Sequence, residues 1–286
     1  MNNLTKPNEK LLEYYFEMKQ PLSQRTKDKY TNYFKKFQQL LREYKISPPT
    51  IVDNIPQLIT ISKEQFENGT IKAEVIKQFF QLLRPLVASN KNAITETINI
   101  YSKNTMKHYK NKTVNELKNS NITYKDLTNL LKNKDVSDID YILFYILINY
   151  GVRNLDLIIN LQEQNGDENY MLVNAKSIRY VRNNYKTFNQ YGTKKISIKN
   201  PRFISIIKRL VGEKKQYLFG AYNETNMSNY INTRFNHYLK TDSRIGEGLI
   251  YKIVNNHYNC KNATKKQIAL ADSRGHSVEV QSSCYE

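Results

Sequence analysis

The chain has 286 residues, 40% of them hydrophobic and 12% aromatic, which is enough for one large domain or for two of ordinary size with real cores. Its 44 Lys and Arg residues against 26 Asp and Glu give a formal net charge of +18, an excess that favours a polyanionic partner because each neutralised phosphate releases condensed counterions. The composition excludes a membrane-spanning protein, since no stretch approaches the roughly 18 consecutive apolar residues of a membrane helix, and the two cysteines exclude a disulfide framework.

The first part of the chain has the pattern of helices. Residues 11–20 form a short amphipathic segment, and residues 24–44 form a longer one with apolar or aromatic residues in steps of three and four, which mark one helical face. Two further helices are predicted over 74–88, where Pro85 kinks or ends the helix, and over 94–111. The face of the longer segment opposite its apolar side carries Lys27, Lys29, Lys35 and Lys36. These basic helices either contact a DNA backbone or present a solvated face.

A polar stretch between residues 110 and 123 predicts a domain boundary. It divides the chain into a helical domain over 1–115 and a second domain over 116–286. The second domain opens with a helix capped by Thr123, with Asp126 in its first turn. An apolar helix over 138–151 follows, and Gly151 is a natural C-terminal cap for it.

Beyond Gly151 the sequence alternates between strand-like and helical pieces. Three short strands, separated by turn-forming Asn and Gly, predict a small antiparallel meander over 169–174, 177–187 and 194–200. Helices are predicted after the meander over 201–212, 227–240 and 248–258. The predicted fold is therefore mostly α with one small β-meander.

Arg153 and Lys186 are the first two candidates for chemistry. Arg153 directly follows the apolar helix, so its guanidinium would be anchored for bidentate contact with phosphate oxygens, and Asp156 could orient it. The simpler alternative is a surface ion pair between these two residues. Lys186 ends the second strand of the meander, where it could enter a minor groove and protonate a leaving oxygen, or could be merely solvated.

The other two candidates are His276, in a Gly275-His276 pair, and Tyr285, which follows the histidine by nine positions. A tyrosine with a pKa of about 10 is a poor nucleophile at neutral pH, but cations around a phosphate compensate by stabilising the charge of the transition state. Such chemistry needs no metal or cofactor, and the sequence has no metal-ligand spacing. Taken alone, the Gly-His pair would be a helix cap with a surface imidazole. With Arg153 and Lys186 it predicts an enzyme that cuts DNA through a phosphotyrosine.

The order of these motifs resembles that of the tyrosine recombinase (phage-integrase-like) family. GVRNLDL, from Gly151, is similar to the first arginine box, with Asp156 where a glutamate is more usual. NYKTFNQYG is similar to the hairpin lysine segment, and GHSVEVQSSCY to the last box. The stretch SQRTKDKYTNYFKKFQQLL is similar to the family's helical core-binding domain. The resemblance covers nearly the whole chain.

The resemblance implies a site-specific recombinase or integrase, built as a helical core-binding domain and an α+β catalytic domain that clamp double-stranded DNA. Tyr285 would form a 3′-phosphotyrosyl intermediate, while Arg153, Lys252 and His276 hold the phosphate and Lys186 protonates the leaving 5′-oxygen. It also implies self-assembly as a dimer or tetramer on DNA, without metal or ATP. The Asn- and Lys-rich style resembles versions from large DNA viruses and their mobile elements, which would place the protein in the cytoplasm, nucleus or viral factory of a host. The N-terminus, MNNLTKPNEKLL, has no apolar core behind its charges and so no secretory signal.

The chain departs from the family where a His-x-x-Arg box should carry a second arginine. Residues 243–258 contain no such box, and Lys252 is the cation nearest the expected position, able to supply charge but not a planar fork. Arg244 lies earlier, and His257 is interpreted as an ordinary helix residue. The departure leaves open a catalytically impaired, recombinase-derived DNA-binding protein, and a type IB topoisomerase activity also remains open.

There are two simpler explanations of the basic charge. Codon bias in an AT-rich genome enriches Asn, Lys, Ile and Tyr together and would raise the charge without any nucleic-acid role. Binding to RNA is disfavoured because the meander lacks the aromatic pattern of an RNA-recognition sheet.

Overall fold

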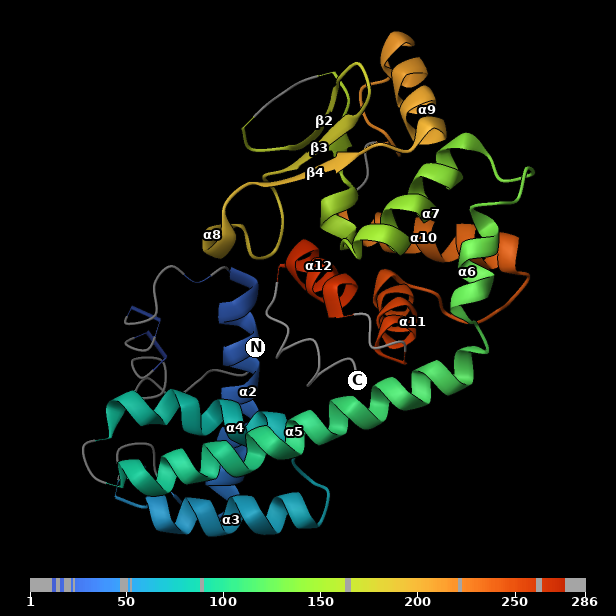
Figure 1. The fold of residues 1–286 in the computed structure, drawn as a ribbon. Helices are drawn as coiled ribbons and strands as arrows, with labels where there is room; N and C mark the ends of the chain where they lie inside the picture. Colours follow the sequence, from blue (N-terminus) through green and yellow to red (C-terminus); the bar gives the residue numbers. More distant parts are fainter. Residues whose placement is uncertain are drawn as a thin grey trace. The chain divides into compact units, whose positions relative to one another are not determined.

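The computed structural model describes most of the chain: residues 12–13, 16–17, 22, 24–46, 51, 53–87, 90–162, 166–220, 223–260 and 264–275 (Figure 1). The chain forms two compact units, Met1–His108 and Tyr109–Glu286. A single helix, α5 (Lys91–Ser120), begins in the first unit and ends in the second. The predicted boundary after residue 115 therefore falls within a helix, and the functions assigned to the two domains stay predictions.

The first unit is entirely helical among its described residues. It contains α2 (Gln24–Glu43), α3 (Ile55–Glu67), α4 (Ala73–Leu83), the short 3-10 helix η2 (Arg84–Leu86) and the start of α5. The apolar face of α2 packs on α4, where the rings of Phe37 and Phe79 stack with 3.4 Å between centroids. Pro85 ends α4 in η2, because proline cannot donate to a helical carbonyl. The predicted segment over 11–20 lies largely outside the described residues, and the sequence did not predict α3.

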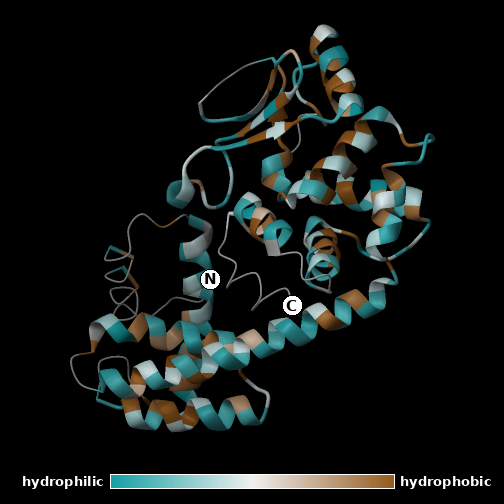
Figure 2. Ribbon diagram, in the orientation of Figure 1, coloured by the Kyte–Doolittle hydropathy of each residue, from teal (hydrophilic) through white to brown (hydrophobic). Residues whose placement is uncertain are grey.

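The second unit is built around α7 (Asp138–Tyr150), which is buried on nearly all sides. Figure 2 shows much of this helix as hydrophobic, and its neighbours supply the rest of the core. α11 (Glu247–Cys260) and α12 (Thr264–Arg274) pack against α7 and against each other. The unit also contains α6 (Tyr124–Leu130), α9 (Pro201–Gly212) and α10 (Glu224–Leu239).

The helix ends match the predicted caps. Thr123 accepts a hydrogen bond from the backbone N–H of Asp126, whose carboxylate accepts from the N–H of Thr123. The Thr123 hydroxyl also donates to this carboxylate at 2.7 Å, and the hydrogen bonds from the Thr123 hydroxyl and backbone N–H lower the pKa of Asp126. Gly151 ends α7 in the left-handed conformation, with φ of 56°. Both predicted caps are confirmed.

The sheet has four strands in the order β1-β2-β3-β4. β2 (Asn169–Val173), β3 (Ile178–Arg182) and β4 (Lys194–Ile198) form the predicted antiparallel meander. The predicted fold, mostly α with a small antiparallel meander, is therefore confirmed. β1 (Ile159–Asn160) adds a parallel pairing with β2, so the whole sheet is mixed and has one strand more than the predicted meander. The sequence did not reveal β1 because only two residues form it.

Two further observations complete the fold. β3 ends at Arg182, so Lys186 lies in the connection between β3 and the short helix α8 (Phe188–Tyr191) rather than at the strand end. No helix among the described residues is long and apolar enough to cross a membrane.

Candidate functional site

The segment that carries Arg153 is fixed where α7 ends. Gly151 accepts no side chain, because a Cβ atom there would lie 2.6 Å from Cδ2 of Tyr251. Its positive φ lets the chain leave the helix and turn directly into Arg153. The backbone N–H of Arg153 then donates to Oδ2 of Asp156 at 2.9 Å, which begins the short helix η3 (Asn154–Leu157).

Asp156 is fully buried, and its ion-pair partner is Arg182 from β3. The two side chains are each 0% exposed, and Nη1 of Arg182 lies 3.0 Å from Oδ2 of Asp156. Burial raises the pKa of Asp156, and the positive charge of Arg182 opposes that rise. The alternative of a surface ion pair between Arg153 and Asp156 is therefore wrong. Asp156 orients Arg153 through the main chain.

Arg182 also reaches the end of α12. Its Nη2 donates to the carbonyl of Ser273, and its guanidinium lies 5.3 Å from the centroid of the Tyr185 ring. Next to it on the same face of β3, the Tyr180 hydroxyl donates to the carbonyl of Asp156. Burial raises the pKa of Tyr180, so this hydroxyl stays protonated and remains a donor. β3 is thereby bonded to both η3 and α12.

Arg274, the last residue of α12, is 4% exposed and joins α12 to α7 and α11. Its Nη1 donates to the carbonyl of Gly151 at 3.0 Å, and its Nη2 to Oε2 of Glu247 at 2.6 Å. The guanidinium lies 4.2 Å from the centroid of the Tyr251 ring. The next residue, Gly275, has φ of 71°, and its carbonyl accepts a hydrogen bond from Oγ1 of Thr187 at 3.1 Å.

Three consecutive residues at the end of α12 therefore contact the other predicted motifs. Ser273 contacts Arg182, Arg274 contacts Gly151, and Gly275 contacts Thr187. We call Ser273, Arg274 and Gly275, with these partners, the α12 junction. It brings together the end of the helix before Arg153, the turn that carries Lys186, and the residues just before His276.

Lys186 is exposed and lies beside the α12 junction in the sequence. Its neighbour Tyr185 is buried and donates to the carbonyl of Gly192 at 2.6 Å, while Thr187 bonds to Gly275. The backbone on both sides of Lys186 is therefore held by hydrogen bonds. His276 and Tyr285 lie outside the described residues, and their roles stay predictions.

Lys252 lies on α11 with its side chain 15% exposed and paired with a carboxylate. Its Nζ is 2.5 Å from Oε2 of Glu116, a residue of α5 within the second unit. The sequence predicted a cation facing a phosphate at this position. In the structure the ammonium group of Lys252 is instead paired with the carboxylate of Glu116.

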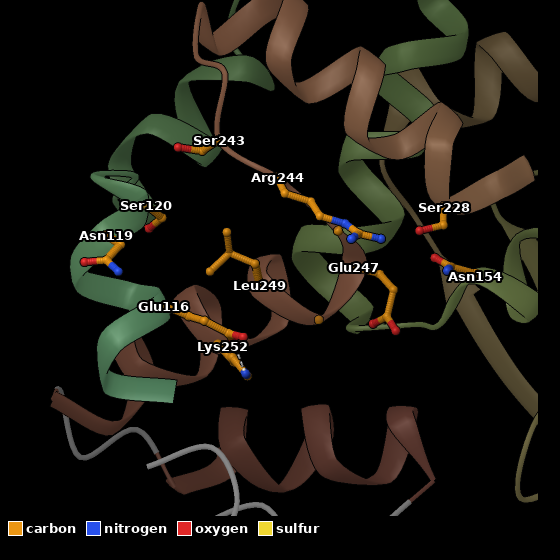
Figure 3. Close-up of a pocket in the computed structure, with 12 residues that line it drawn as sticks. Glu116, Asn119, Ser120, Asn154, Ser228, Ser243, Arg244, Glu247, Leu249 and Lys252 are labelled. Carbon is orange, nitrogen blue, oxygen red and sulfur yellow. Dashed lines mark hydrogen bonds and ion pairs between the residues drawn. The ribbon is translucent and has the colours of Figure 1, made fainter. Parts of the chain in front are cut away.

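A cavity of about 560 Å³ adjoins this pair. Figure 3 shows part of its lining, which includes Glu116, Asn154, Ser228, Arg244, Glu247 and Lys252. Asn154 directly follows Arg153, and Glu247 holds Arg274, so the cavity borders the α12 junction.

Arg244 is the exposed cation of this cavity. It lies in the loop before α11 and not on the helix, which begins at Glu247. Within the described part of the chain, no hydrogen bond or ion pair engages its side chain. Figure 3 shows the side chain extended across the cavity toward the side that carries Ser228, Asn154 and Glu247.

Sequence reasoning missed the residues that build the junction. Arg182 had a visible signal, because it shares a strand face with Ile178 and Tyr180, where a charged residue needs a buried partner. Arg274 had only its position before Gly275-His276. His257 lies on α11 and stacks on Tyr124 with 3.8 Å between ring centroids, and its interpretation as an ordinary helix residue stays a prediction. No cluster of three or more potential metal ligands occurs among the residues placed by the structure.

Comparisons with known proteins add little. No family model matches the chain, and no curated protein matches it. One similar solved structure is the crystal structure of XerA recombinase, with a TM-score of 0.38 and 10% sequence identity over 98% of this chain and 93% of that chain. So low a TM-score and identity carry no argument about this protein.

Proposed function

We propose that this protein is a DNA-binding enzyme of the tyrosine recombinase class, which cleaves and rejoins duplex DNA through Tyr285. The observation that supports the proposal is the α12 junction. Segments at Gly151, Thr187 and Gly275 that are far apart in sequence meet there through hydrogen bonds from the Arg274 and Thr187 side chains to backbone carbonyls. Each of these anchors is within two residues of Arg153, Lys186 or His276.

The proposed reaction has two steps. The Tyr285 hydroxyl loses its proton to water and attacks a phosphodiester, the bond from phosphorus to the 5′-oxygen breaks, and Lys186 donates a proton to that oxygen. A 5′-hydroxyl from a second strand then returns a proton to Lys186 and attacks the phosphotyrosine, and the released Tyr285 oxygen takes a proton from water as the phosphodiester is restored. Arg153 and His276 bind the phosphate oxygens and stabilise the charge of both transition states. The bond energy is conserved in the tyrosyl ester, so the reaction needs no ATP.

The direct test uses a duplex nicked near the cleavage site, from which the released strand diffuses away. We expect wild-type protein to form an SDS-stable protein–DNA adduct and Tyr285→Phe to form none. Tyr109→Phe, which changes an exposed tyrosine of α5, is the matched control and should form the adduct. Lack of an adduct with wild type, or an adduct with Tyr285→Phe, would exclude the proposal.

The rejoining step separates recombination from topoisomerase activity. Two duplexes that share a site should exchange strands in a recombinase, whereas a type IB topoisomerase should only relax supercoiled plasmid. Assembly as a dimer or tetramer on DNA belongs to the same proposal. It predicts protein–DNA complexes with two or four protomers in sedimentation analysis.

A second candidate function is a recombinase-derived DNA-binding protein that no longer cleaves. The Lys252–Glu116 ion pair favours this function. Lys252 is the cation predicted to replace the second arginine, and its charge is neutralised by Glu116. This function predicts duplex binding that weakens steeply with salt, and no adduct. If Glu116→Gln with Lys252→Arg restores an adduct that the wild type lacks, the remainder of the site is intact.

A further inference from the structure

Burial of Arg274 costs hydration free energy, and an apolar side chain could fill the same space without that cost. A guanidinium removed from water loses several kcal/mol of hydration free energy, by order of magnitude, and apolar side chains of similar volume are often equally stable in such sites. Arg274 is nevertheless 4% exposed and packed over Tyr251. Its burial therefore points to a role in the two contacts that it makes, with Gly151 and Glu247.

The contact with Gly151 links two helix ends. The carbonyl of Gly151 lies at the C-terminus of α7, where carbonyls lack helical partners and a cation is electrostatically favoured. Arg274 is itself the last residue of α12. One hydrogen bond of 3.0 Å between Nη1 and the carbonyl therefore joins the two helix ends directly.

The position of Gly151 in the sequence explains why this link matters. Arg153 follows Gly151 by two residues. The bond between Gly151 and Arg274 thus fixes the backbone that leads directly to Arg153. We infer that Arg274 is a positioning residue, which sets the place of the Arg153 side chain relative to a bound phosphate through the carbonyl of Gly151. This inference rests on the proposed function for the role of Arg153.

A purely structural role for Arg274 is the alternative, and one double variant separates the two. Arg274→Met alone leaves Glu247, which is 20% exposed, without its cation and so destabilises the fold. Arg274→Met with Glu247→Gln removes both charges, so the unfolding transition should return close to that of wild type. The bond to Gly151 remains absent in this double variant.

We expect the double variant to bind duplex within about twofold of wild type but to form the adduct on the order of 100-fold more slowly, the loss that a displacement of about 1 Å can cause. Arg274→Lys with Glu247 intact should recover part of the rate, because an ammonium can donate to the same carbonyl. Arg209→Met, a change of an exposed arginine on α9, is the matched control. A stable double variant with the wild-type rate would overturn the inference, as would Glu247→Gln alone causing the full loss.

A spectroscopic readout keeps the inference separate from the proposed function. The Nε–H group of an arginine side chain gives a resonance of its own, and Arg153→Lys identifies the resonance of Arg153. Adding an intact duplex should shift this resonance in wild type, and the shift should be lost in the double variant although the duplex still binds. If wild type forms no adduct but the shift depends on Arg274, the catalytic proposal fails and the positioning role stands. An equal shift in both proteins would refute the positioning role.

Discussion

The α12 junction and the neighbouring cavity both contain basic side chains beside carboxylates, but they differ in exposure. In the junction, Arg182 and Arg274 are 0% and 4% exposed, and each holds a carboxylate and a backbone carbonyl. In the cavity, Lys252 is paired with Glu116 while Arg244 is exposed and extends into open space. The junction cations thus bind the protein itself.

This difference shows that a cation near a motif is not necessarily a cation for a ligand. The planar fork of arginine donates in several directions at once, so one buried side chain joins a carboxylate to a distant carbonyl. Lysine carries a point charge, and the ammonium group of Lys252 pairs with one carboxylate, that of Glu116. Arg244 is therefore the basic residue of the cavity most accessible to a phosphate. The sequence predicted that role for Lys252.

The largest expected effect is on folding stability, and it tests whether the buried Arg182–Asp156 pair holds the α12 junction together. Arg182→Met leaves Asp156 buried without a cation, and we expect it to lower the free energy of unfolding by about 3–5 kcal/mol. Urea unfolding followed by circular dichroism measures the change. Arg182→Met with Asp156→Leu should recover much of the loss, and the exposed control Arg209→Met should cause no clear change. A small loss in Arg182→Met would show that the buried pair does not hold the junction.

The next effect tests the close approach of α7 and α11. Gly151→Ala combines a left-handed backbone with a Cβ atom 2.6 Å from the Tyr251 ring, so we expect a loss of about 2–4 kcal/mol in the free energy of unfolding. Gly248→Ala changes a glycine on α11 with open space around it and should be neutral or slightly stabilising. Equal results for the two variants would contradict the tight contact at Gly151.

The smallest effect concerns the cavity and is measured as the salt dependence of duplex affinity. Arg244→Gln should reduce the slope of log affinity against log salt concentration by about 1, the loss of one phosphate contact. Lys252→Gln should change the slope less, because Glu116 already neutralises that ammonium group. Glu116→Gln should steepen the slope by releasing Lys252. A larger effect of Lys252→Gln than of Arg244→Gln would reverse the comparison and restore Lys252 as the ligand cation.

Local patterns in the sequence predicted the elements that depend on neighbouring residues. The steps of three and four apolar residues in α2, the Thr123 cap of α6 and the Gly151 end of α7 are all present. The three antiparallel strands follow from alternating residues between turn signals. Each of these features depends on interactions within a few positions, which a single sequence displays directly.

Long-range contacts decided the rest. β1 exists because its two residues pair with β2 and bond to the chain near Leu218, and neither contact is visible in its own sequence. Arg274 reaches Gly151 across 123 positions, and Lys252 reaches Glu116 across 136. The sequence by itself determined which residues could carry charge to a phosphate. Only the tertiary structure decided which of them stay available, because burial and the nearest carboxylate set whether a cation faces the protein or a ligand.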